Sequence, residues 1–204
     1  MVAALGDDPL SEARWAELVA DQVDNGAVRR VLGLGGLALI EIDVHGENRI
    51  VVVFGANGAL DSGWVRAQFE HLRVGRGDVV CVQLEIPLEA AGAALELRRE
   101  AGSWCLLNAT TWTNEAEHLL ANCDLLVVNR LEAYQVTGLV GSDPLDPVAE
   151  TLASRVSTVF ITLGAQGAIC VAQKARWRCA APRVAVVDTT AAGDAFVAAG
   201  LLDS

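Results

Sequence analysis

The feature that most constrains this chain is the alternation of short apolar runs with helical stretches from residue 78 onward. The runs have the length of strands and read DVVCVQL, SWCLLN, CDLLVVN and STVFITLG. The stretches between them include PLEAAGAALELRREAG and DPVAETLASRV, which have the composition of helices. Strands that alternate with helices indicate βαβ units and a parallel sheet. Because the strands are almost continuously apolar, the sequence predicts an α/β fold whose sheet is covered on both faces.

The residues ahead of this sheet follow other patterns. Asp8 is the expected N-cap of a helix that starts with Pro9. Two β-rich runs, GGLALIEID and NRIVVVF, are joined by VHGE and indicate a hairpin, which we expect within residues 28–56. Near the other end of the chain, the strand-like run VAVV stops just before Asp188.

Composition and charge limit the classes of function. The 204 residues fit one domain, or one domain with a small appendage, and a hydrophobic fraction of 52% suffices for a sizeable core. The net charge of −11 argues against a nucleic-acid partner. The sequence contains no run of about 18 apolar residues, so we expect no membrane span. The acidic first residues do not resemble a signal peptide. The five cysteines form no C-x-x-C pair and the three histidines are scattered, so we expect reduced thiols, a cytoplasmic protein and no zinc site.

Polar residues follow the apolar runs, where strands of the predicted sheet end. In open α/β sheets, ligands bind at the carboxyl ends of the strands. Each of these residues could also be an ordinary turn residue, but together they form a candidate site. They are Glu85, Asn108, Asn129, Thr162–Gly164 and the segment from Asp188 onward.

The segment TTAAGD, residues 189–194, precedes a run of small residues that predicts a helix. Backbone N–H groups at a helix N-terminus favour negative charge, and Gly193 would let a ligand approach the backbone. Such donors could stabilise a phosphoryl group while Asp194 takes a proton from an attacking hydroxyl. Asp194 could equally be a helix-capping acid, so spacing alone leaves both interpretations open.

Five segments, in order, resemble the ribokinase-like (PfkB) carbohydrate kinases. DTTAAGDAF resembles the family's carboxyl-terminal signature, D-T-x-A/G-A-G-D-x-F. The other matches are GENRIVVVFGANGAL, VQLEIPLE, VNRLEAYQVTG and ITLGAQGA. The resemblance implies a three-layer α/β/α, Rossmann-like sheet with a small β lid hairpin, formed by residues 1–204 as a single domain. It also implies an incomplete domain, since the family's N-x-D strand, its G-G-x-x-x-N segment and its last helices have no counterpart here.

For catalysis, the resemblance implies that Asp194 is the base acting on the primary hydroxyl of the sugar. The backbone of Ala191, Ala192 and Gly193 would form the anion hole. Glu85 would reach the sugar hydroxyls, although it could also be a turn acid.

For the cofactors, the resemblance implies ATP, Mg²⁺ and a monovalent cation, usually K⁺. Glu132 would act near Mg²⁺ and the phosphates through water, while Asp188 and Thr190 would help hold K⁺. Asn129 would contact the nucleotide, although it could instead be a strand-end cap, and Glu132 a solvated helix residue. The other nucleotide contacts would come from Thr162, Leu163, Gly164, Ala165, Gln166 and Gly167.

The function implied by the resemblance is ATP-dependent phosphorylation of D-ribose to ribose 5-phosphate. A related kinase with another sugar or a nucleoside as acceptor is a second hypothesis. A catalytically impaired protein that binds a nucleotide or a partner is a third. Because dimers of this family meet through the lid hairpin, the resemblance also implies that a homodimer could form.

Overall fold

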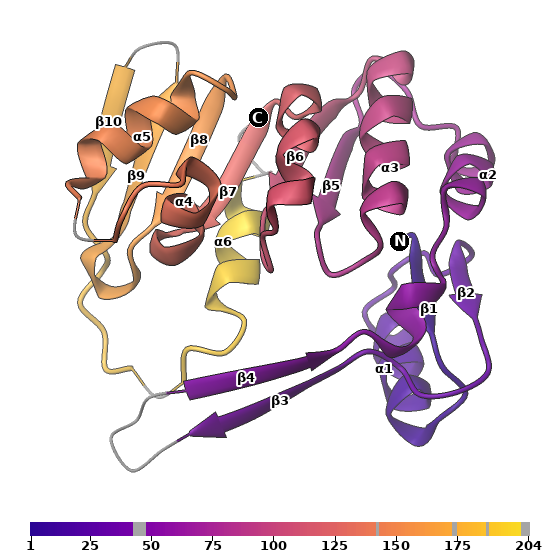
Figure 1. The fold of residues 1–204 in the computed structure, drawn as a ribbon. Helices are drawn as coiled ribbons and strands as arrows, with labels where there is room; N and C mark the ends of the chain where they lie inside the picture. Colours follow the sequence, from indigo (N-terminus) through magenta and orange to yellow (C-terminus); the bar gives the residue numbers. More distant parts are fainter. Residues whose placement is uncertain (43–47, 142, 173–174, 187, 201–204) are drawn as a thin grey trace. The chain divides into compact units, whose positions relative to one another are not determined.

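The computed structural model describes residues 1–42, 48–141, 143–172, 175–186 and 188–200. The chain divides into two compact units. The first unit contains Met1–Arg73 and Glu85–Ala94, and the second contains Val74–Leu84 and Leu95–Ser204. Figure 1 shows the elements of both. The single domain expected from the sequence stays a prediction.

The second unit is built on a six-stranded sheet in the order β10-β9-β8-β7-β6-β5. Four neighbouring strands are parallel, as predicted. They are β5 (Val79–Gln83), β6 (Trp104–Asn108), β7 (Leu125–Asn129) and β8 (Thr158–Thr162). The sequence patterns did not reveal the antiparallel strands β9 (Ala168–Ala172) and β10 (Ala175–Cys179), which extend the sheet beyond β8.

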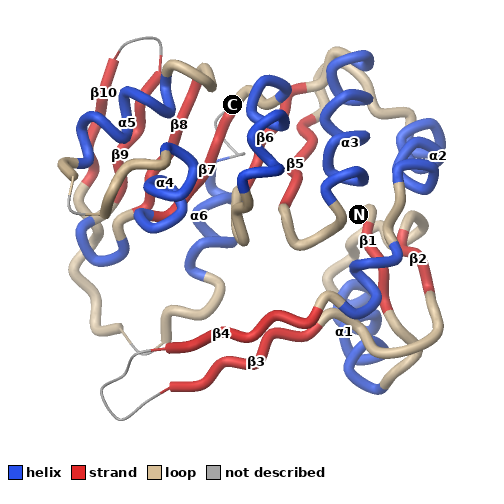
Figure 2. The backbone as a smooth tube through the Cα atoms, viewed as in Figure 1, coloured by secondary structure: helices blue, strands red, loops and turns tan. Residues whose placement is uncertain are grey.

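Helices cover both faces of this sheet, which confirms the three-layer α/β/α prediction (Figure 2). The helices are α3 (Leu88–Ala101), which contributes to both units, η2 (Asn114–Asn122), α4 (Arg130–Thr137), α5 (Leu145–Ala153) and α6 (Ala192–Gly200). Val197 of α6 packs against Leu125 and Val127 of β7. Successive strand residues point to opposite faces, so Leu126 and Val128, both fully buried, support the opposite layer.

The strand expected from the run VAVV is wrong for the described residues. Val184 and Val186 lie in irregular backbone, with 69% and 67% of their surface exposed. No described strand pairs with them. An apolar run needs a partner strand for its backbone N–H and C=O groups, which this segment lacks within the described part of the chain.

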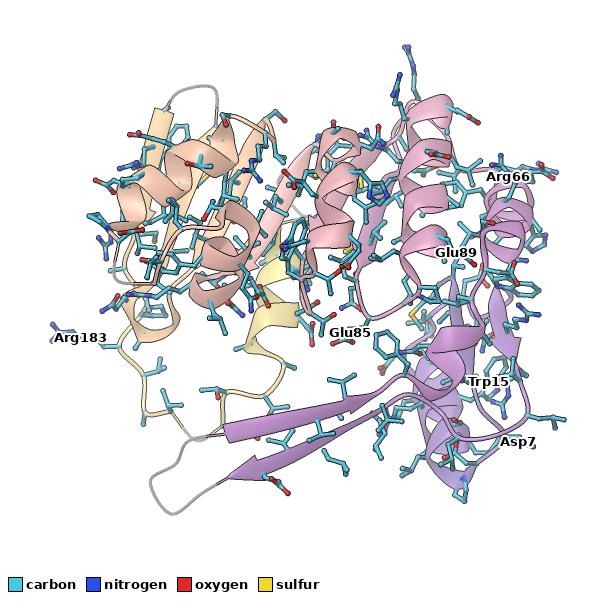
Figure 3. The ribbon with its side chains drawn as sticks, viewed as in Figure 1. Asp7, Trp15, Arg66, Glu85, Glu89 and Arg183 are labelled. Atoms are coloured by element: carbon cyan, nitrogen blue, oxygen red, sulfur yellow. The ribbon has the colours of Figure 1, made fainter. Side chains whose placement is uncertain are left out.

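In the first unit, β1 (Ala3–Leu5) and β2 (Val28–Arg30) form a parallel pair, and α1 (Pro9–Ala20) lies between them in sequence. Asp8 caps α1, as predicted, and accepts hydrogen bonds from the Ser11 hydroxyl at 2.6 Å and the Gly35 N–H at 2.7 Å. These two bonds are the main reason that the pKa of Asp8 falls to about 2. The Arg30 guanidinium lies over the ring of Trp15, which is labelled in Figure 3.

The predicted hairpin is also present. β3 (Leu37–Ile42) and β4 (Asn48–Val53) pair antiparallel, followed by η1 (Gly55–Ala59) and α2 (Ser62–Leu72). The connection 43–47 lies outside the described residues. The hairpin is narrower than 28–56, because residues 28–30 belong to β2. Within the described part of the chain, no helix is both long and apolar enough to cross a membrane.

Candidate functional site

The parallel strands of the second unit bring several predicted residues to one edge of the sheet. Gln83 of β5 is in register with Asn108 of β6, and Asn129 of β7 is in register with Thr162 of β8. All four close their strands, so they lie at the carboxyl edge. Asn108 is buried, with 7% of its surface exposed.

Asn129 and Glu132 form a reciprocal capping box at the start of α4. The Asn129 Oδ1 atom accepts the Glu132 N–H at 2.9 Å, and the Glu132 Oε2 atom accepts the Asn129 N–H at 2.7 Å. Asn129 is therefore a strand-end cap, whatever else it binds. Its amide nitrogen, which donates to no described residue, remains for a ligand.

Glu132 is buried, so the alternative interpretation of Glu132 as a solvated helix residue is wrong. Only 8% of its surface is exposed, and this burial raises the pKa of its carboxyl group, while the Asn129 N–H acts in the opposite direction. No three His, Cys, Asp or Glu side chains gather as a metal site among the described residues. A single carboxylate with one oxygen not yet hydrogen-bonded suits Mg²⁺ that is held mainly by waters and phosphates.

The turn after β8 closes on itself. The Leu163 N–H donates to the Gly167 carbonyl at 2.8 Å, and the Gly167 N–H donates to the Gly164 carbonyl at 3.0 Å. Gly164 has a φ of +57° and Gly167 a φ of +91°, values that favour glycine. The structure thus explains both glycines of ITLGAQGA by backbone conformation, before any ligand is considered.

Gly167 is also a point of close packing. A Cβ atom there would lie 1.9 Å from the Cys179 carbonyl oxygen and 2.7 Å from the Ala181 nitrogen. The chain that follows β10 therefore passes directly over Gly167.

The segment that leads into α6 contains the predicted cation ligands and anion hole. The Asp188 Oδ1 atom accepts both the N–H and the hydroxyl of Thr190 at 2.8 Å, which lowers the pKa of Asp188. Ala191 has a φ of +58°, a conformation that costs a non-glycine residue about 1–3 kcal/mol and is often found at functional sites. The roles of Asp188 and Thr190 towards K⁺ stay predictions.

Two of the predicted anion-hole N–H groups differ in whether they already donate a hydrogen bond. The Ala192 N–H donates to the Thr189 carbonyl at 3.2 Å, whereas the Gly193 N–H has no acceptor among the described residues. Apart from the adjacent residues and the backbone of α6 itself, no described atom lies within 4 Å of where a Cβ of Gly193 would be. Open space beside a helix N-terminus leaves room for an anion.

Asp194 lies in the first turn of α6 rather than before the helix. The helix is fixed to the sheet by Val197 and by Phe196, whose ring meets that of Phe160 edge-on with centroids 5.6 Å apart. Asp194 itself is exposed. A rigid helix therefore holds a solvent-accessible carboxylate.

Cys81 is a neighbour of Asp194 that sequence reasoning missed. Cys81 is in register with Leu106, which packs against α6, so both side chains face that helix. Although the residue is exposed overall, burial of the thiol raises the pKa of Cys81, and the negative charge of Asp194 raises it further. No spacing in the sequence links these two residues.

This proximity predicts the reactivity of Cys81. Replacing Asp194 with Asn removes a negative charge that disfavours the thiolate, so we expect Cys81 to be alkylated faster at a given pH. Iodoacetamide labelling followed by mass spectrometry of the Cys81 peptide measures the rate. Asp188→Asn is the control and should leave the rate unchanged; an unchanged rate in Asp194→Asn would contradict the placement.

Glu85 is half-buried in the first unit and labelled in Figure 3, and its contact with a sugar stays a prediction. Arg130, which the sequence patterns did not single out, donates from its guanidinium to the Gln166 side chain. This bond connects the start of α4 with the turn after β8.

Similarity to known proteins agrees with this arrangement. Residues 1–202 match the pfkB family carbohydrate kinases. The chain is 32% identical to a ribokinase of Schizosaccharomyces pombe, over 98% of this chain and 64% of the relative. It is 28% identical to a deoxyribokinase of Salmonella typhi, over 97% of this chain and 65% of the relative.

A solved structure of Arabidopsis thaliana ribokinase, complexed with ribose and ATP, has a similar fold. Its TM-score is 0.78 at 27% identity, and the match covers 97% of this chain and 66% of that one. The chain thus spans about two thirds of the length of its relatives. With a family match over almost its whole length, the chain belongs to the pfkB family of carbohydrate kinases.

Proposed function

We propose that this chain phosphorylates a sugar with ATP, and that D-ribose is the acceptor. The observation that carries the proposal is that the capping box, the turn after β8 and the Asp194 helix all belong to one compact unit. The Arabidopsis ribokinase structure, which holds ribose and ATP on a similar fold, supports this choice of substrates.

In this proposal, Asp194 accepts the proton of the sugar's primary hydroxyl as that oxygen attacks the γ-phosphorus of ATP. The O–P bond forms, the bond to the ADP oxygen breaks, and ADP leaves. The N–H of Gly193 would donate to the charge that develops on the transferred group. Catalysis would depend on how these groups are positioned and charged, because the protein forms no covalent bond to the phosphoryl group during direct transfer.

Asn129 and the turn of residues 162–167 would bind the nucleotide. Mg²⁺, when bound, would neutralise charge on the phosphates, and Glu132 would orient one of its waters. Asp188 and Thr190 would help hold K⁺ beside the N-terminus of α6.

A second acceptor is favoured by a specific observation. The deoxyribokinase of Salmonella typhi is a relative at 28% identity, so 2-deoxyribose is the runner-up. The two sugars differ by one hydroxyl group, and a site that hydrogen-bonds this hydroxyl rejects the sugar that lacks it.

A panel of acceptors tests the proposal. The 204-residue chain is incubated with ATP, Mg²⁺ and K⁺, and ADP formation is measured with ribose, 2-deoxyribose, fructose or adenosine. We expect the highest kcat/KM for ribose, followed by 2-deoxyribose. Higher turnover of adenosine would contradict the sugar assignment, and no acceptor-dependent ADP would contradict the kinase assignment for this chain.

We also propose that a homodimer forms through the β3–β4 hairpin. Large apolar side chains of the hairpin are exposed, among them Leu39 at 52%, Ile40 at 48% and Val53 at 44%. Exposed apolar groups on both strands favour an interface. Light scattering in solution should give twice the monomer mass; a monomer at micromolar concentration would contradict the dimer.

A further inference from the structure

Arg130 holds an unusual position at the carboxyl edge of the sheet. It is the first residue of α4, directly after Asn129, and its guanidinium donates to the Gln166 side chain. Both side chains are exposed. They connect two of the segments to which nucleotide binding is assigned above.

Local structure does not explain a positive charge at this position. The N-terminus of a helix carries partial positive charge, so a cation there is electrostatically unfavourable. Glu132 supplies the acid that the helix start prefers, but its hydrogen bond goes to the Asn129 N–H. Arg130 forms no ion pair with any described residue. A residue that breaks a local preference without a compensating opposite charge points to function.

The charge of the surroundings strengthens this argument. The chain has 15 Lys and Arg against 26 Asp and Glu, so its overall field repels polyphosphates. Four segments of the second unit either follow β6, β7 or β8 or lead into α6: residues 109–113, 129–132, 163–167 and 188–194. Together these segments contain one basic residue, Arg130. Among these segments, Arg130 is therefore the one cationic side chain available to an anion that binds at this edge.

We propose that Arg130 binds phosphate oxygens of the nucleotide, with Gln166 as the residue that positions its guanidinium. An arginine has five N–H donors in a planar fork, and the bond to Gln166 leaves donors for a phosphate. The inference rests on the nucleotide site proposed above and adds to it a residue whose positive charge interacts with the phosphates.

Nucleotide titrations of variants test this inference. ATP, ADP, AMP and adenosine are titrated by calorimetry into the wild-type chain, Arg130→Gln, Arg130→Lys and Gln166→Ala. The matched control is Arg99→Gln, which removes the same charge at an exposed site in the last turn of α3, just before β6 begins. Thermal melts verify that every variant is folded.

We expect Arg130→Gln to weaken ATP binding about 10-fold or more, with a smaller loss for AMP and none for adenosine. Arg130→Lys should recover part of the affinity, and Gln166→Ala should lose part of it. The affinity of the wild type for ATP should also fall more steeply with salt than that of Arg130→Gln. Arg99→Gln should bind like the wild type.

Two results would overturn the inference while leaving the nucleotide site intact. One is wild-type ATP affinity in Arg130→Gln. The other is an equal loss for adenosine and ATP, which would mean that Arg130 only tethers α4 to the turn. A folded wild-type chain that binds none of the four compounds would instead overturn the nucleotide site itself, and the role of Arg130 with it.

Discussion

Asp194→Asn should lower the rate of ribose-dependent ADP formation by about 10²- to 10⁴-fold, the range expected for loss of a general base. Asn has nearly the shape of Asp but cannot accept the hydroxyl proton. Asp194 is exposed, and α6 is fixed to the sheet through Phe196 and Val197. The substitution should therefore leave the fold and the Kd for ATP close to those of the wild type.

Measuring kcat and the Kd for ATP separately distinguishes a base from a binding residue. Glu100→Gln is a suitable control, because it removes an exposed carboxylate from the far end of α3. The control should retain full activity. Near-normal turnover by Asp194→Asn would show that another group accepts the proton, and Asp194 would then be only an acid of the first helical turn.

Gly167→Ala should lower the free energy of unfolding by about 2–4 kcal/mol and the Tm by about 5–15 °C. The added Cβ would lie 1.9 Å from the Cys179 carbonyl oxygen. Because that neighbour is backbone, no side-chain rotation can relieve the clash. The φ of +91° adds strain for any residue with a Cβ atom.

Gly164→Ala separates these two causes. Gly164 also has a positive φ, of +57°, but apart from its two chain neighbours no described atom lies within 4 Å of its Cβ position. The Gly164→Ala substitution should therefore lower the free energy of unfolding by only about 1–2 kcal/mol, from backbone strain alone. Thermal and urea unfolding measure both variants. Equal destabilisation by the two substitutions would contradict the close packing of the chain after β10 against Gly167.

The parallel part of the sheet could be predicted because its strands are apolar and separated by helical stretches. The residues of β6 and β7 are almost all buried, so their composition alone carried the information. β10 could not be found in this way, since every one of its residues is exposed and its sequence, ARWRC, has no apolar pattern. The run VAVV shows the converse, because apolar residues without a partner strand form no strand.

The candidate site likewise has features that could be predicted from the sequence and features that could not. Asn129 and Glu132 were singled out because VNRLEAYQVTG resembles a family motif, and Asn129 was also considered as a strand-end cap. The reciprocal capping box that joins them was not predicted, although its spacing of three residues is present in the sequence. The burial of Glu132 was not visible, since it depends on what packs around α4. Interactions between distant segments leave no periodic signal in a single sequence. Examples are the effect of the Asp194 charge on Cys81 and the hydrogen bond from Arg130 to Gln166.

Hydrogen exchange with and without MgATP tests the central claim, a nucleotide site at the carboxyl edge of the sheet, most directly. Bound nucleotide should slow exchange in residues 129–132, 162–167 and 190–194. Exchange at the opposite edge, in residues 99–104 and 122–124, should not change. Protection confined to the opposite edge or to the first unit, or no protection at saturating MgATP, would contradict the site described here.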